Sequence, residues 1–165
     1  MPTNNTVSFK SFLKKFPEID LPITLSIDTH FTFSKNNKQL HPLELEQFIT
    51  LMEGPIEDEF TEIIPCFALK DTKDFHAIVY WKAALLDYQY ILATFTKRGV
   101  PIARKVIAGT FSDGVNIAQS VATIDSDWTI NIVTGASGLK EEYDATTSTA
   151  IEVDLLADGN IAESE

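Results

Sequence analysis

Three histidines are the first residues whose chemistry could support a reaction: His30, His41 and His76. Asp28 lies two residues before His30, and on a strand the two side chains would share a face and could contact each other. His30, His76 and a carboxylate could then form a metal site or an acid/base pair. Polar residues at strand margins explain the same pattern more simply, because no local partner motif accompanies either histidine. We therefore expect no metal site and no cofactor.

Catalytic signatures are absent from the sequence. It contains no Gly-rich phosphate loop, no HExxH, no CxxC, no GxSxG and no EF-hand spacing. Site residues can still converge from distant positions in a fold. The first hypothesis is therefore a non-catalytic protein-binding or interaction module, and a hydrolase-type enzyme using His30 or His76 with a carboxylate ranks below it.

Aromatic residues on the predicted strands suggest another function, the binding of a small molecule. Rings on the inner face of a cupped sheet or barrel can line a cavity, whereas in a solid sheet the same rings are core residues. Arg104 or Lys105 could anchor a polar group of the ligand. The ligand-binding candidates are Trp81, Tyr88, Tyr90, Trp128 and Arg104.

The chain is strongly acidic, with a net charge of −11 at pH 7. Nucleic acids and anionic membrane surfaces attract proteins through Lys and Arg side chains. The best basic cluster in this sequence is small and consists of Lys97, Arg98, Arg104 and Lys105. We expect neither nucleic acid nor a membrane as a partner, and the charge indicates no oligomeric state.

An acidic run between residues 53 and 62 contains no Lys or Arg. It could be a solvated loop, a Ca²⁺ site or a contact surface for a protein partner with a basic surface. Calcium needs about six to eight oxygen ligands held by specific turns, and this run does not resemble such a loop. The partner-binding candidates are Glu57, Asp58, Glu59 and Glu62.

Cys66 is the single cysteine, so no internal disulfide can form. It lies in the apolar run "IIPCFAL", which predicts a core thiol rather than a nucleophile. The N-terminal residues show no apolar h-region and no cleavage site. They predict a cytoplasmic protein, although a secreted chain whose signal peptide had been replaced by Met1 would look the same.

The stretch "FHAIVYWKAALLDYQYILATFT", residues 75–96, is apolar enough to suggest a membrane span. Lys82 and Asp87 lie near its middle, and each charge costs about 2.5–3.5 kcal/mol at the centre of a membrane helix. The aromatic and β-branched residues favour strands. We therefore predict two antiparallel strands with a bend at 83–87.

Regular spacing of strands and turns continues after this stretch. Further strands are predicted at 100–111, 116–124, 128–134 and 147–157, with a longer loop at 135–146. In the N-terminal part, apolar residues at helical spacing predict one helix near Phe9–Phe16 and a second at 41–52, whereas the alternation in 21–34 predicts an extended segment.

These elements predict one α+β domain over residues 1–165. Its N-terminal segment, 1–62, contains two short helices, and residues 63–163 form an antiparallel meander of about six to eight strands. A meander of this length must close, stack or protect its edges, so we expect a curved or barrel-like sheet, with a two-layer sandwich as the alternative. We expect a soluble acidic domain, and its leading functions are protein interaction and small-molecule binding.

Overall fold

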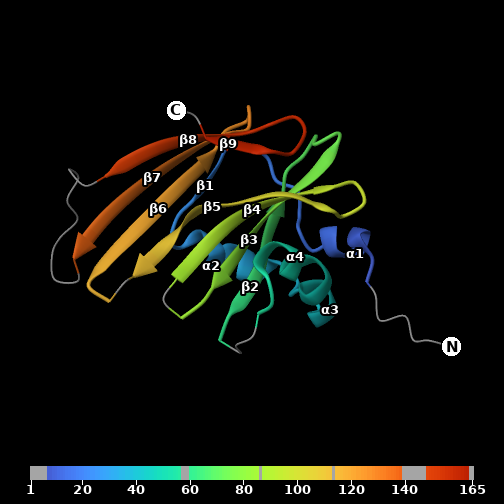
Figure 1. The fold of residues 1–165 in the computed structure, drawn as a ribbon, viewed down its shortest axis with the longest axis horizontal. Coiled ribbons are helices and arrows are strands. Elements are labelled where there is room, and N and C mark those ends of the chain that lie inside the picture. Colours follow the sequence, from blue (N-terminus) through green and yellow to red (C-terminus); the bar gives the residue numbers. More distant parts are fainter. Residues whose placement is uncertain (1–6, 57–59, 86, 113, 139–147, 164–165) are drawn as a thin grey trace.

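The structure, a computed structural model, describes residues 7–56, 60–85, 87–112, 114–138 and 148–163. One large curved sheet dominates it, and the helices lie near the N-terminal half of that sheet (Figure 1). The elements in chain order are α1 (Phe9–Leu13), β1 (Ile23–Leu25), α2 (Thr29–Asn36), α3 (Pro42–Glu44), the π-helical turn η1 (Leu45–Ile49), α4 (Thr50–Glu53), β2 (Glu62–Ala68), β3 (Phe75–Ala83), β4 (Asp87–Thr96), β5 (Pro101–Ser112), β6 (Asn116–Ile124), β7 (Thr129–Gly138), β8 (Thr149–Leu155) and β9 (Ile161–Glu163).

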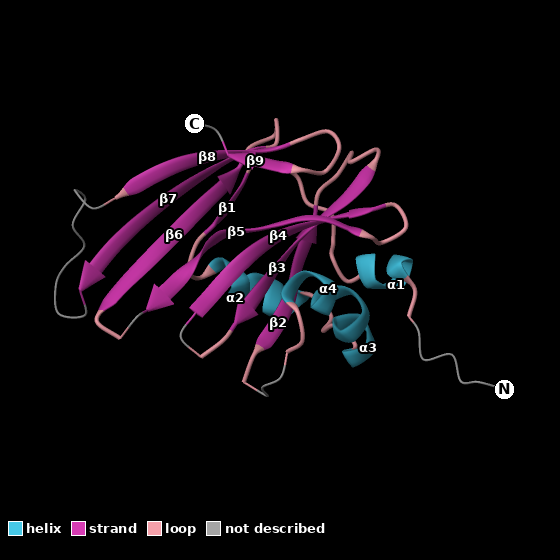
Figure 2. Cartoon of the chain, viewed as in Figure 1, coloured by secondary structure: helices cyan, strands magenta, loops and turns pink. Residues whose placement is uncertain are grey.

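The strands follow one another as an antiparallel meander, which confirms the predicted fold class. The order is β2-β3-β4-β5-β6-β7-β8-β9, and β1 pairs with β6 outside this path. The described residues contain nine strands, because the short strands β1 and β9 add to seven longer ones. The sheet curves strongly (Figure 2), but its terminal strands do not pair in the described part of the chain, so it does not form a closed barrel.

Residues 75–96 form the two antiparallel strands β3 and β4, as predicted. Trp81 lies directly opposite Tyr90 in the ladder, and both side chains face the same side of the sheet. Ile78 and Tyr80 belong to a second buried cluster on the opposite side. Both faces of this hairpin are therefore covered, and no helix in the described ranges is long and apolar enough to cross a bilayer.

Strand β5 divides the sheet into two walls. A bulge shifts the β4–β5 register beside Ile107, and Gly109 follows with φ of +154°. Beyond the bulge, residues 109–112 of β5 pair with the first half of β6. The short strand β1 pairs with the second half of the same β6 edge, where Leu25 lies opposite Ala122. Strands β2–β5 and β6–β9 consequently face each other across a shared core.

This inner core joins the two walls to β1 and α2. Most of its residues alternate along each strand, because successive side chains of a strand point to opposite faces of the sheet. They include Leu25, Phe33, Cys66, Phe67, Trp81, Tyr90, Leu92, Ile107, Ala122, Ile124, Ile130, Val153 and Leu155. The predicted core position of the Cys66 thiol is thereby confirmed.

The outer core lies between the other face of β3–β4 and the remaining helices (Figure 2). Helix α1 carries part of the predicted apolar stripe, and the Ser8 hydroxyl caps it by accepting a hydrogen bond from the Ser11 amide. The second predicted helix begins at Pro42, also as predicted, but its middle turn is π-helical. Phe12 and Phe48 pack in this layer with ring centroids 4.8 Å apart.

The prediction of an extended segment at 21–34 is wrong for most of its length. Only Ile23–Leu25 is a strand, and α2 begins at Thr29. The Thr29 hydroxyl accepts a hydrogen bond from the Ser26 amide at 2.9 Å, and this turn ends the extended path. The predicted loop at 135–146 begins too early, since β7 continues to Gly138, and the rest of that loop lies outside the described residues.

Candidate ligand-binding pocket

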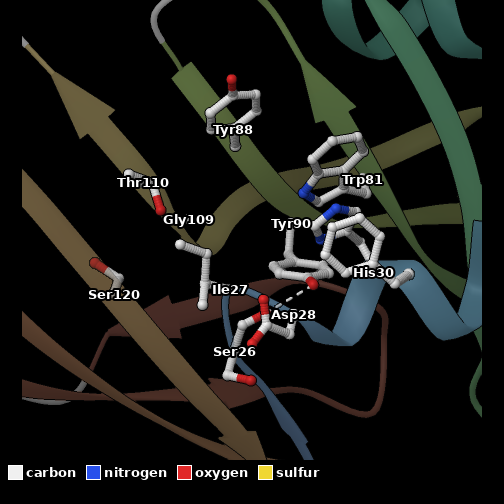
Figure 3. A pocket seen from close by; sticks show the side chains of 11 residues that line it. Ser26, Ile27, Asp28, His30, Trp81, Tyr88, Tyr90, Gly109, Thr110 and Ser120 are labelled. Carbon is white, nitrogen blue, oxygen red and sulfur yellow. Dashed lines mark hydrogen bonds between the residues drawn. The ribbon is translucent and has the colours of Figure 1, made fainter.

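A pocket of about 340 Å³ opens where the start of α2 meets the inner face of the sheet (Figure 3). It lies beside the bend in β5, where the two walls separate. Residues from β3, β4, β5 and β6, from the segment between β1 and α2, and from the first turn of α2 surround it. They are Ser26, Ile27, Asp28, His30, Phe31, Trp81, Tyr88, Tyr90, Gly109, Thr110 and Ser120.

Aromatic rings form the wall that belongs to β3 and β4. The Trp81 and Tyr88 rings are parallel within 1°, with centroids 5.7 Å apart. On the α2 side, the His30 imidazole stacks on Trp81 at a centroid distance of 4.0 Å and an angle of 2°. Phe31 packs against His30 with centroids 4.1 Å apart. This arrangement presents flat π-surfaces to whatever enters the pocket.

Tyr90 connects the pocket wall to the segment that leads into α2. Its ring is buried, and its hydroxyl donates a hydrogen bond of 2.8 Å to the Ser26 carbonyl oxygen. Burial raises the pKa of Tyr90, so the hydroxyl stays protonated as a donor. Residues 26–28 are thus held against the sheet by a side chain 64 positions further along the chain.

The pocket rim is apolar and faces solvent. Ile27 is 52% exposed, Phe31 is 63% exposed and Tyr88 is 44% exposed. Single exposed apolar side chains are ordinary on protein surfaces, whereas apolar side chains grouped around a hollow mark binding sites. These three residues come from two separate parts of the chain and meet at one opening.

The lining residues at the start of α2 include one carboxylate, Asp28, and one imidazole, His30. Asp28 is exposed, makes no capping hydrogen bond and has no ion-pair partner among the described residues. The buried Nδ1 of His30 meets no hydrogen-bond partner of acceptable geometry in the described part. Burial lowers the pKa of His30 below its ordinary value, which favours the neutral imidazole at pH 7.

Gly109 brings the β5 backbone close to the aromatic wall. It has a positive φ of +154° and follows the bulge that shifts the register between β4 and β5. A Cβ at this position would lie 2.1 Å from the Tyr88 carbonyl oxygen. The β6 side of the pocket is polar. Ser120 lines it, and the Ser120 hydroxyl forms a hydrogen bond of 2.7 Å with the Thr134 hydroxyl.

Three of the five sequence-based ligand candidates line this pocket together, namely Trp81, Tyr88 and Tyr90. Trp128 does not join them. Its ring packs on Phe75 with centroids 5.8 Å apart, and Phe75 lies six residues before Trp81 on β3, about 20 Å along the strand. Arg104 does not join them either, since it lies on the outer face of the sheet beside the helices.

Arg104 belongs instead to a buried ion-pair network around Glu53. Its guanidinium donates two hydrogen bonds to the Glu53 carboxylate, of 2.6 and 2.9 Å. Lys82 donates a third of 3.0 Å, and the Tyr80 hydroxyl donates a fourth. Burial alone would raise the pKa of Glu53, but these donors outweigh it and hold the pKa below its usual range. The expected role of Arg104 as a ligand anchor therefore has no geometric support.

The histidines do not share a site. His30 packs on Trp81 at the inner face, while His76 lies on the outer face against Phe9, with ring centroids 5.6 Å apart. His41 begins the helix at Pro42, where its Nδ1 accepts from the Leu43 amide at 3.1 Å. The combined His30/His76 site is therefore wrong. His76 and Trp81 are even and odd residues of β3 and face opposite sides of the sheet, and His30 stacks on Trp81. The described residues contain no group of three possible metal ligands.

Asp28 and His30 are close, but not for the reason that the sequence suggested. Both lie at the start of a helix rather than on one face of a strand, and no hydrogen bond joins them in the described structure. Of the acidic candidates, Glu62 is exposed at the start of β2. Glu57, Asp58 and Glu59 lie outside the described residues, so a basic partner for this run stays a prediction.

Sequence reasoning missed Ile27, Phe31, Gly109 and the stacking role of His30. Because residues 21–34 were predicted to be extended, nothing in the sequence indicated that these side chains lie beside Trp81. The one available signal was Gly109, a glycine within a predicted strand, which can mark a bulge or a close backbone approach. Comparisons with protein-family models, with curated proteins and with solved structures found no match for this chain.

Proposed function

We propose that this protein binds a small organic molecule in the pocket between α2 and the bend of the sheet. The observation that carries this proposal is the pocket itself, a space of about 340 Å³ lined by Trp81, Tyr88 and Tyr90. Small-molecule sites are typically hollows of about 300–1,000 Å³ with aromatic walls and a few polar groups. The solvent-facing apolar rim supports entry of an apolar ligand body.

The pocket favours small-molecule binding over protein interaction, which is the reverse of the order expected from the sequence. Protein interaction ranked first because no motif suggested a ligand and the chain is acidic. A cavity depends on how distant segments meet, and no sequence pattern showed that β1, α2 and β5 leave a space beside Trp81. Interaction with a basic protein partner stays a separate prediction, which rests on the acidic residues near Glu62.

Intrinsic fluorescence tests the proposal directly, because the chain has two tryptophans and one of them lines the pocket. In a Trp128→Phe variant, Trp81 is the sole indole emitter. A library of small aromatic and aliphatic compounds should contain members that quench or shift this emission in a saturable way. The matched control is Trp81→Phe, in which the remaining Trp128 should not respond to the same compounds.

Thermal stability offers an independent reading of the same binding. A compound present at 100 times its dissociation constant should stabilise the folded state by about 2.7 kcal/mol. A saturable response of Trp128 with no response of Trp81 would contradict the proposed location. A library that changes neither fluorescence nor melting temperature would contradict small-molecule binding itself.

A further inference from the structure

The pocket also carries information about the charge of its ligand. Among its described lining residues, Asp28 is the formally charged side chain at pH 7, and no Lys or Arg is present. The aromatic wall adds the electron-rich face of Tyr88, which is solvent-facing, beside Trp81, one face of which is covered by His30. An anionic ligand would meet a carboxylate and negative π-faces, whereas a cationic ligand would find both favourable.

We propose that the ligand is an organic cation, an ammonium-type centre attached to an apolar body that lies against Trp81 and Tyr88 with Asp28 as counter-ion. This inference rests on the proposed binding function and specifies its ligand class. A cation over an indole or phenol ring is attracted by the ring quadrupole, and indole is the best of the natural partners. The apolar body would contact the rim residues Ile27 and Phe31.

Asp28 is free to act as this counter-ion. It occupies the N-cap position of α2 but makes no capping hydrogen bond, and it forms no ion pair with any described residue. The positive end of the α2 dipole lies at the same place, and the carboxylate offsets this partial charge. A neutral His30 adds no competing positive charge beside Trp81.

The charge of the whole molecule acts in the same direction. A net charge of −11 attracts cations and repels anions before contact. Near the pocket, the exposed carboxylate of Glu62 acts on the same imidazole as Asp28. Charge complementarity therefore exists at two levels, the lining residues and the surrounding surface.

A pair of isosteric probes separates charge from shape. Phenyltrimethylammonium and tert-butylbenzene have the same outline and differ in the positive charge. In the Trp128→Phe background, we expect the ammonium probe to bind between about 3- and 30-fold more tightly than the neutral probe, which corresponds to the range of cation–π energies. Equal affinities would overturn the cation assignment while leaving small-molecule binding intact. No binding of either probe would count against both proposals.

Substitution of Asp28 tests its role as counter-ion. Asp28→Asn keeps the shape and should weaken the ammonium probe by about two- to fivefold, as expected for a partly exposed charge pair, with no effect on the neutral probe. The control is Asp74→Asn, an exposed carboxylate just before the opposite end of β3, which should change neither affinity. An equal loss for both probes in Asp28→Asn would overturn the counter-ion role and assign Asp28 to the shape of the pocket.

Discussion

The imidazole of His30 lies flat on the indole of Trp81, with ring centroids 4.0 Å apart and planes within 2°. This contact joins the start of α2 to the inner face of β3. It closes one side of a pocket whose other sides come from β4, β5 and β6. The position of α2 therefore decides whether the aromatic face is a solid core or the wall of a binding site.

Tyr90→Phe should loosen this side of the pocket. The change removes the hydroxyl that donates to the Ser26 carbonyl and leaves that oxygen without this donor. We expect the free energy of unfolding to fall by about 0.5–1.5 kcal/mol, measured by urea denaturation, together with weaker binding of any pocket ligand. Tyr88→Phe is the matched control, and an equal loss of stability there would contradict this role of the Tyr90 hydroxyl.

Acidification should destabilise the protein through its partly buried histidines. Burial lowers the pKa of His30, outweighing the carboxylates of Asp28 and Glu62, and burial together with Lys97 lowers the pKa of His76. The unfolded chain takes up protons near its usual histidine pKa of about 6.5, whereas the folded chain resists them. The stability is therefore fully present above that pH and is lost as the pH falls through the lowered folded-state values.

NMR titration of the imidazole signals measures these pKa values, and urea denaturation at pH 7.5 and 5.5 measures the stability change. In a His30→Phe variant, the loss of stability between these two pH values should be smaller than in the wild type. Midpoints at or above the usual histidine value for both residues would show that burial does not control them.

Glu53→Gln should be one of the more destabilising single substitutions on the outer face. The change removes the negative charge that pairs with Arg104 and Lys82. The Glu53 side chain is only 2% exposed, so water cannot replace this pairing. Removing one partner of a buried ion pair typically costs about 3–5 kcal/mol, and the partial exposure of both cations favours the lower end. Glu163→Gln, which breaks the exposed pair with Lys105, should cost less than about 1 kcal/mol.

The comparison of these two variants by chemical denaturation isolates the effect of burial. Similar small losses for both would indicate that the Glu53 carboxylate is solvated in solution. The same experiment repeated in high salt should leave the loss in Glu53→Gln nearly unchanged, since buried pairs are screened much less than exposed ones.

Gly109→Ala should disturb both the sheet bend and the pocket. The added Cβ would lie 2.1 Å from the Tyr88 carbonyl oxygen, a backbone atom that cannot move aside without breaking the ladder. Gly114 also has positive φ, but a Cβ there meets nothing within 4 Å. We expect Gly109→Ala to reduce the unfolding free energy by about 1–3 kcal/mol more than Gly114→Ala, the usual cost of overpacking. Equal losses would show that φ strain alone matters at both positions.

Much of the sheet follows from local sequence patterns. Residues 75–96 combine charges that exclude a membrane span with aromatic and β-branched residues that favour strands, and they form β3 and β4. The turns that follow are rich in Gly and Asp, so the number and direction of the later strands were also predictable. Local pattern failed in 21–34, where alternating apolar residues favour a strand. The Ser26–Thr29 turn and the packing of Phe33 in the inner core favour a helix from Thr29 instead.

The sequence by itself determined that this protein is an acidic α+β meander with aromatic residues on its central strands, because strand period, turn chemistry and charge are local properties. Only the tertiary structure decided which aromatics share a space. In the fold, Trp81 lies beside Tyr88, Tyr90 and His30, whereas Trp128 packs on Phe75 at the other end of β3. Arg104 forms an ion pair with Glu53, 51 positions earlier in the chain. Such groupings depend on the bend at Gly109 and on where α2 docks, and these are set by contacts between segments that no local pattern encodes.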